Sequence, residues 1–147
     1  MNLNRLKKDL ILKNGIIVDP FNKNSFEGSL WIKNGRVAGI GDFEFPNKED
    51  AKVIDCTNKI ITHGFCDLHA HFRALGENDK EDFESGSRSA LSGGFTRVCV
   101  MPNTLPPIDS PELISYVKNK GSKTPVYVHP VGSVTKDQKG KQITEMN

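Results

Sequence analysis

The sequence predicts an α/β fold in which a small all-β module precedes the first strands of a parallel sheet, of the kind that builds (β/α)₈ barrels. Up to about residue 60 the apolar runs are short and separated by turn signals, as in all-β structure. From residue 61 strand-like runs alternate with helix-like runs, which is the pattern of βα units. We therefore assign residues 1–60 to the all-β module and residues 61–147 to the first part of a barrel.

Two Asn-Gly dipeptides support the all-β module. Asn14-Gly15 lies inside the apolar run at residues 10–18, and an Asn-Gly flanked by β-branched residues is a strong hairpin signal. The run at residues 30–40 repeats the arrangement around a second Asn-Gly. A further short strand is expected at Val53–Cys56, so the module should consist of strands and tight turns.

The βα units follow in order along the chain. The first strand is expected from Ile60 to about Phe72. Asp79 can cap a helix that begins at Lys80, and Gly93-Gly94 can end it. The second strand is expected at Thr96–Met101, where Pro102 closes it.

A second helix and a third strand complete the pattern. Ser110 is a suitable N-cap before Pro111 at the first helical position, and Gly121 can end this helix. The third strand is expected from Pro125 to about Val131. A complete barrel needs roughly 250 residues, so about three strands and two helices predict a fragment of a barrel that cannot close by itself.

Composition excludes several classes of function. With 20 basic and 18 acidic residues, the net charge of +2 gives no reason to expect a nucleic-acid partner. No run approaches the ~18 apolar residues of a membrane span, and the start of the chain lacks a secretory signal. We expect a cytoplasmic protein with reduced cysteines at positions 56, 66 and 99, whose spacing fits neither a disulfide framework nor a zinc knuckle.

Chemistry is expected where the strands end. In an extended chain residues i and i+2 share a face, so His69 and His71 can converge on one metal ion. Alone, such a pair is a weak signal. In barrel enzymes, however, the active site is built from the carboxyl ends of the strands, and polar segments also follow the second strand at residues 101–104 and the third at residues 132–135.

These motifs together resemble the amino-terminal third of a dihydroorotase of the amidohydrolase superfamily, the cyclic amidohydrolases. The likeness spans nearly the whole chain, and the all-β start resembles the composite β-sandwich of that family, which the carboxyl terminus of a complete protein finishes. The matching residues are Gly64, Asp67, His69, His71 and Arg73; Lys80-Glu81-Asp82; Ser85-Gly86; Gly93-Gly94-Phe95-Thr96; and Met101-Pro102-Asn103-Thr104 with Pro106-Pro107.

The resemblance implies a set of roles. His69 and His71 would be ligands of a catalytic zinc, one of one or two ions in the complete enzyme. Arg73 and Asn103 would bind the carboxylate end of the substrate. The implied reaction is reversible hydrolysis of the cyclic amide of dihydroorotate to N-carbamoyl-L-aspartate in pyrimidine biosynthesis. The further metal ligands and the general base would come from later strands, so we assign no catalytic residue within 1–147 and expect the chain alone to be inactive.

Some positions depart from the family pattern or are assigned structural roles. His63 replaces a proline, and Ala74-Leu75 replaces a Glu-Pro pair after Arg73. We interpret His63 as a surface histidine and His129, which falls in mid-strand, as a packed or lumen-filling side chain. Asp67 is expected to support the site without binding metal.

Two alternatives stay open. One is an allantoinase or hydantoinase, which shares the paired histidines and the cyclic-amide chemistry. The other is a non-catalytic, dihydroorotase-like subunit that only binds a partner. For the complete protein, a homodimer or association with other pyrimidine-pathway enzymes is expected, besides the small-molecule substrate.

Overall fold

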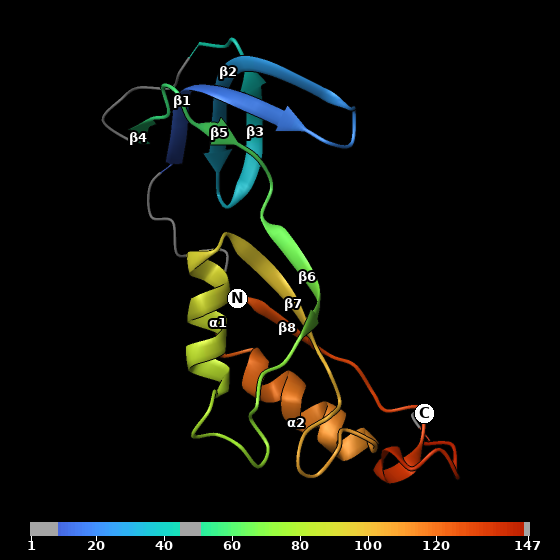
Figure 1. The fold of residues 1–147 in the computed structure, drawn as a ribbon. Helices are drawn as coiled ribbons and strands as arrows, with labels where there is room; N and C mark the ends of the chain where they lie inside the picture. Colours follow the sequence, from blue (N-terminus) through green and yellow to red (C-terminus); the bar gives the residue numbers. More distant parts are fainter. Residues whose placement is uncertain (1–8, 45–50, 146–147) are drawn as a thin grey trace. The chain divides into compact units, whose positions relative to one another are not determined.

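The computed structural model describes residues 9–44 and 51–145, and the chain divides between His63 and Gly64 into two compact units (Figure 1). Each unit is considered by itself below. Among the described residues, no helix is long and apolar enough to cross a membrane.

The first unit is a five-stranded mixed sheet with the order β3-β2-β1-β4, in which β5 also pairs with β1. Strand β1 runs antiparallel to β2 and parallel to β4 and β5. Ile17, Cys56 and Ile61 are buried at its centre. The strands are β1 (Asp9–Asp19), β2 (Asn24–Lys33), β3 (Arg36–Gly41), β4 (Ala51–Asp55) and β5 (Ile60–Ile61).

The hairpin turns predicted at the two Asn-Gly dipeptides are confirmed at one and wrong at the other. Asn34-Gly35 joins β2 to β3 with φ values of 51° and 73°, as the predicted two-residue hairpin turn requires. The hairpin predicted at Asn14-Gly15 is wrong, because β1 continues through it. Asn14 has φ of 59°, and the pairing with β2 shifts between Leu12 and Gly15, which marks a β-bulge.

Close packing explains why β1 needs a glycine at that bulge. A Cβ atom on Gly15 would lie 2.5 Å from Cδ1 of Ile61, so any larger residue would have to push the buried Ile61 side chain aside. The chain turns instead after Asp19, whose carboxylate accepts hydrogen bonds from the backbone N–H groups of Phe21 and Asn22. The two Asn-Gly pairs therefore have different roles in one sheet, since one forms a hairpin turn and the other a bulge within a strand.

The described part of this unit forms one sheet, and the second sheet of the predicted sandwich is not among these residues. Several apolar side chains on the sheet are more than one-third exposed. They are Ile16, Val37, Ile40, Val53, Ile54 and Ile60.

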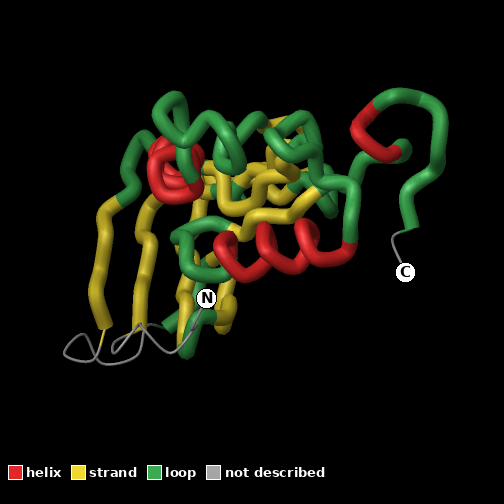
Figure 2. The backbone as a smooth tube through the Cα atoms, turned by 90° about the horizontal axis from the view of Figure 1, so that it is seen from below, coloured by secondary structure: helices red, strands yellow, loops and turns green. Residues whose placement is uncertain are grey.

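The second unit confirms the predicted alternation of strands and helices. Its three strands are parallel in the order β6-β7-β8, and Figure 2 shows α2 running alongside the strands. The elements are β6 (Phe65–Ala70), α1 (Phe83–Ser92), β7 (Phe95–Val100), α2 (Pro111–Gly121), β8 (Tyr127–Pro130) and a 3₁₀ turn at Lys136–Gln138.

The single strand predicted from Ile60 to Phe72 is wrong, because the structure divides it. Ile60–Ile61 pairs with β1 in the first sheet, whereas β6 pairs with β7 in the second. Residues 62–64 lie in neither strand. A Cβ atom on Gly64 would lie 2.1 Å from Cγ2 of Thr96, so only glycine fits at this position without moving Thr96.

The helix boundaries follow from their caps. Helix α1 begins at Phe83 and is capped by Asp82, so the predicted cap at Asp79 is wrong. Asp82 accepts from the backbone N–H of Ser85 at 2.7 Å, and the Ser85 hydroxyl accepts from the backbone N–H of Asp82 at 3.0 Å. This reciprocal capping box outcompetes the earlier aspartate. The predicted Ser110 cap of α2, with Pro111 after it, is confirmed.

The core of the second unit lies between the sheet and the two helices. Val98, Val117 and Ile108 are each about 1% exposed, and Phe72 packs so closely on α1 that a Cβ atom on Gly86 would lie 2.8 Å from its ring. This packing fixes the loops after β6 and β7, which carry the residues that sequence analysis placed in the site.

We predict that Ile108→Ala destabilises the second unit by about 2–5 kcal/mol, because it removes buried methyl groups and leaves a cavity. Ile143→Ala is the matched control, since Ile143 is 76% exposed. Urea denaturation monitored by circular dichroism measures both. Equal effects of the two substitutions would show that Ile108 is not part of a packed core.

The capping box also predicts a pH dependence. Hydrogen bonds from the backbone and side chain of Ser85 lower the pKa of Asp82 below its ordinary value of 3.8. A lowered pKa in the folded state means that the stabilisation is present above pH 3.8 and is lost as the pH falls through the folded-state value. We therefore expect the melting temperature of Asp82→Asn to fall less steeply with decreasing pH than that of the wild type in the acid range. An equally steep fall in both proteins would contradict the assignment.

Candidate active site

The two histidines converge at the end of β6. His69 is the next-to-last residue of the strand and His71 follows its end. Their Nε2 atoms are 3.2 Å apart, and the rings meet edge to face with their centroids 5.0 Å apart. His69 is exposed and His71 is half-buried. The structure therefore brings this predicted pair together, with the same nitrogen of each ring aimed at one point.

Asn103 holds one ring of the pair. It follows β7, the strand next to β6, and its Oδ1 lies 2.8 Å from Nδ1 of His71. An amide oxygen can only accept a hydrogen bond, so this contact uses the ring nitrogen that faces away from His69. The structure thus joins Asn103 to the histidine pair through a contact that sequence analysis did not anticipate.

Asp67 shapes the backbone beneath the other ring. Its Oδ1 accepts a hydrogen bond of 2.9 Å from the backbone N–H of His69. The pairing of β6 with β7 is irregular between Asp67 and Ala70, so the His69 N–H donates to a side chain in place of a regular ladder. This contact is consistent with the supporting role predicted for Asp67. The sequence spacing does not predict that the donor is the backbone N–H of His69.

The distance between the imidazoles fits a zinc ion. Two ligands of a tetrahedral zinc, with bonds of about 2.0–2.1 Å, lie about 3.3–3.4 Å apart, close to the 3.2 Å between the two Nε2 atoms. In residues 9–44 and 51–145 there is no group of three or more His, Cys, Asp or Glu side chains that could hold a metal. The pair can therefore offer two ligands, fewer than the three that a catalytic zinc takes from protein.

A pocket of about 380 Å³ adjoins the pair. It lies between β6, the chain that follows it and α1. Asp67, His69 and His71 supply its polar wall, and the facing side is made by small residues of α1, among them Gly86 and Ser89. A small molecule can therefore reach the histidines from solvent.

Arg73 lies two residues beyond His71 but points to a different partner. Its guanidinium is 3.7 Å from the Glu77 carboxylate, and both side chains are about one-third exposed. A partly exposed ion pair of this kind contributes little and can rearrange at small cost. The structure does not place Arg73 in contact with the histidine pair.

The other two histidines, His63 and His129, have different neighbours. His63 is exposed in the first unit, where the pKa of Asp19 is lowered mainly by hydrogen bonds from Asn22, with a smaller contribution from the charge of His63. His129 is in mid-strand on β8, as expected, with its Nε2 3.4 Å from Nη1 of Arg97. It is exposed in this structure.

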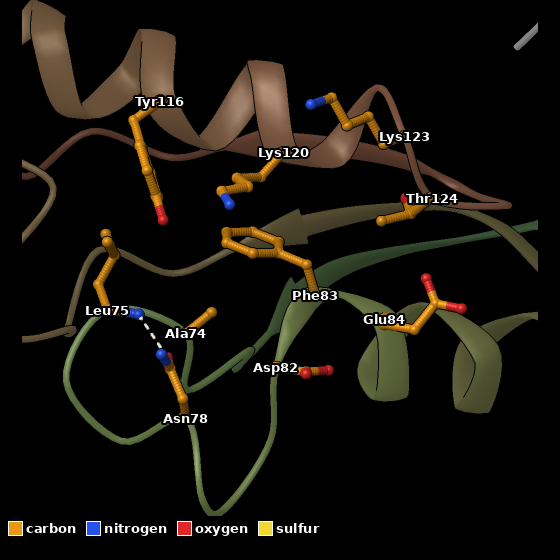
Figure 3. Close-up of a pocket in the computed structure, with 10 residues that line it drawn as sticks. All are labelled: Ala74, Leu75, Asn78, Asp82, Phe83, Glu84, Tyr116, Lys120, Lys123 and Thr124. Atoms are coloured by element: carbon orange, nitrogen blue, oxygen red, sulfur yellow. Dashed lines mark hydrogen bonds between the residues drawn. The ribbon is translucent and has the colours of Figure 1, made fainter.

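A second pocket, of about 300 Å³, is drawn in Figure 3 and contains none of the predicted site residues. It lies between the loop after β6, the start of α1 and the end of α2, where Tyr116 and Lys120 face Phe83. Its carboxylates are already engaged, since Asp82 caps α1 and Glu84 pairs with Arg88 at 2.6 Å.

Comparisons with known proteins agree on the family. A family model described as dihydro-orotase-like matches residues 58–147. The chain is 41% identical over 138 residues to a dihydroorotase of Sulfurihydrogenibium sp. and 40% identical over 138 residues to one of Aquifex aeolicus. These alignments cover 93% and 92% of this chain but 32% of each relative. The chain thus spans about a third of the length of its curated relatives.

Solved structures extend the likeness to the fold. The L-hydantoinase of Arthrobacter aurescens superposes with a TM-score of 0.74 at 27% identity, covering 87% of this chain and 28% of that one. A D-hydantoinase gives 0.67 at 29% identity, covering 88% and 28%. An N-acyl-D-glutamate deacylase of Bordetella bronchiseptica, solved with zinc, gives 0.59 at 21% identity, covering 86% and 29%, and shows the fold alone.

We predict that Asp67→Ala separates the two imidazoles, because the His69 N–H loses its acceptor, whereas Asp67→Asn keeps an oxygen there and preserves them. The nuclear Overhauser effect between the ring protons of His69 and His71 measures this. Asp109→Ala is the control, since Asp109 accepts from the backbone of Asp137 elsewhere. An effect that survives in Asp67→Ala would refute the role of Asp67.

Proposed function

Because this chain belongs to the dihydro-orotase-like family, we propose that it carries the first part of the active site of a dihydroorotase, a metal-dependent hydrolase of cyclic amides. The observation that supports this most is the 3.2 Å approach of the His69 and His71 Nε2 atoms at a strand end. The complete protein would interconvert dihydroorotate and N-carbamoyl-L-aspartate in pyrimidine biosynthesis.

His69 and His71 would bind a zinc ion. A bound zinc lowers the pKa of its water to about 7 and polarises a carbonyl, so that hydroxide can attack an amide at neutral pH. The imidazoles would act as neutral nitrogen ligands, with Asp67 fixing the backbone of His69 and Asn103 holding the ring of His71. The rest of the ligand set would come from outside residues 1–147, and we expect no activity from this chain alone.

Arg73 and Asn103 would bind the substrate carboxylate. A planar guanidinium can meet a carboxylate with two parallel hydrogen bonds, and the weak pairing of Arg73 with Glu77 would yield to such a partner. The Asn103 amide has N–H donors in addition to the oxygen that accepts from His71. The loops after β6 and β7 would thus bring the substrate next to the metal ion.

The remainder of the complete protein would also finish the fold. A closed barrel leaves no open sheet edge, whereas β6 and β8 are the outer strands of this three-stranded sheet. The exposed apolar residues of the first sheet, such as Val37 and Ile40, would be covered by the second layer of a composite sandwich. A cytoplasmic location and association with itself or with other pyrimidine-pathway enzymes stay predictions.

A hydantoinase-type activity is the second candidate, because two hydantoinases superpose on this chain with TM-scores of 0.74 and 0.67. The two activities differ in what the substrate carries. Dihydroorotate has a free carboxylate, which Arg73 would bind, whereas hydantoin has none. A subunit without catalysis is the third candidate.

A chimera tests these functions directly. In it, this chain replaces the matched segment of the Aquifex aeolicus dihydroorotase. We expect the chimera to hydrolyse dihydroorotate, and His69→Ala or His71→Ala to lower kcat/KM by more than about 100-fold, because each removes a metal ligand. His129→Ala is the matched control and should retain activity.

The outcomes separate the candidates. A chimera that hydrolyses hydantoin or allantoin in preference to dihydroorotate would favour the second function. A folded chimera that binds zinc but hydrolyses none of the three would contradict the proposal and favour a non-catalytic role.

A further inference from the structure

The hydrogen bonds around the histidine pair determine where its protons lie. A neutral imidazole has one N–H and one nitrogen lone pair. Oδ1 of Asn103 lies 2.8 Å from Nδ1 of His71, and an amide oxygen only accepts. Nδ1 of His71 must therefore carry the proton, which leaves a lone pair on its Nε2, the nitrogen that faces His69.

The second ring presents the same nitrogen. Nε2 of His69 lies 3.2 Å from Nε2 of His71, close to the separation of two ligands of one tetrahedral zinc. A lone pair on Nε2 of His71 is therefore the form that a metal shared by the two rings requires.

We propose that Asn103 is a positioning residue that fixes His71 in the Nδ1-protonated form, which keeps the Nε2 lone pair of this ring available to a metal ion held between His69 and His71. The second half rests on the proposed metal centre. His71 then needs no change of tautomer to bind the ion.

This assignment gives Asn103 a role that does not involve substrate. Partners that orient a metal-binding histidine typically change metal affinity 10–100-fold when removed. Asn103 is exposed, so its replacement need not disturb the core. Asn103→Leu removes the acceptor, while Asn103→Asp keeps an oxygen for Nδ1 of His71. Asn119→Leu, on the exposed face of α2, is the matched control.

The first experiment needs no metal. Long-range ¹H–¹⁵N correlation spectra of the histidine-labelled chain distinguish the two tautomers at each ring. We expect the wild-type chain, Asn103→Asp and Asn119→Leu to show His71 protonated at Nδ1, and Asn103→Leu to lose this preference. A wild-type His71 protonated at Nε2, or an Asn103→Leu variant unchanged from wild type, would overturn the proposal.

Zinc titration of the same four variants, each placed in the chimera that supplies the remaining ligands, tests the metal half. We expect Asn103→Leu to bind zinc about 10–100-fold more weakly than wild type, and Asn103→Asp to bind no more weakly. Equal zinc affinity of wild type and Asn103→Leu would overturn the role of Asn103 and leave the proposed function intact. The expected tautomers in the chain, together with a chimera that binds no zinc, would contradict the metal centre and uphold the tautomer assignment.

Discussion

The approach of two imidazole nitrogens to 3.2 Å at the end of β6 is the constraint on which the rest of the site depends. An edge strand by itself would not hold two exposed or half-buried rings in this arrangement. Asp67 fixes the backbone of His69, and Asn103 reaches across from the neighbouring strand to fix the ring of His71. The site is thus a property of two adjacent strand ends and not of one short motif.

The packing of the second unit makes that juxtaposition available. Parallel pairing of β6 with β7 places their carboxyl ends at one edge of the sheet, which brings residues 71 and 103 together although they are 32 positions apart. Phe72 is buried and packs against Gly86 of α1. The residue next to His71 is therefore a core residue, so the exposed chemistry is anchored in buried apolar contacts.

Sequence analysis predicted what local signals determine. The βα alternation, the Ser110-Pro111 start of α2, the Asn34-Gly35 turn and the strand-end position of the histidines follow from residue type and spacing, and the structure agrees. It failed where tertiary contacts decide. A bulge absorbed Asn14-Gly15 because β5 packs there, and pairing with two different sheets broke the strand expected after Ile60. The hydrogen bond from His71 to Asn103 depends on strand pairing, so neither segment alone reveals it.

X-ray absorption spectroscopy of the zinc-loaded chain tests the central claim most directly, because it counts the protein ligands and identifies their elements. The account predicts imidazole nitrogens at about 2.0–2.1 Å, numbering two per zinc, with oxygen from solvent in the remaining positions. Scattering from sulfur at about 2.3 Å would show that cysteine holds the metal. That result, or a single imidazole per zinc, would contradict the claim that His69 and His71 bind one ion together.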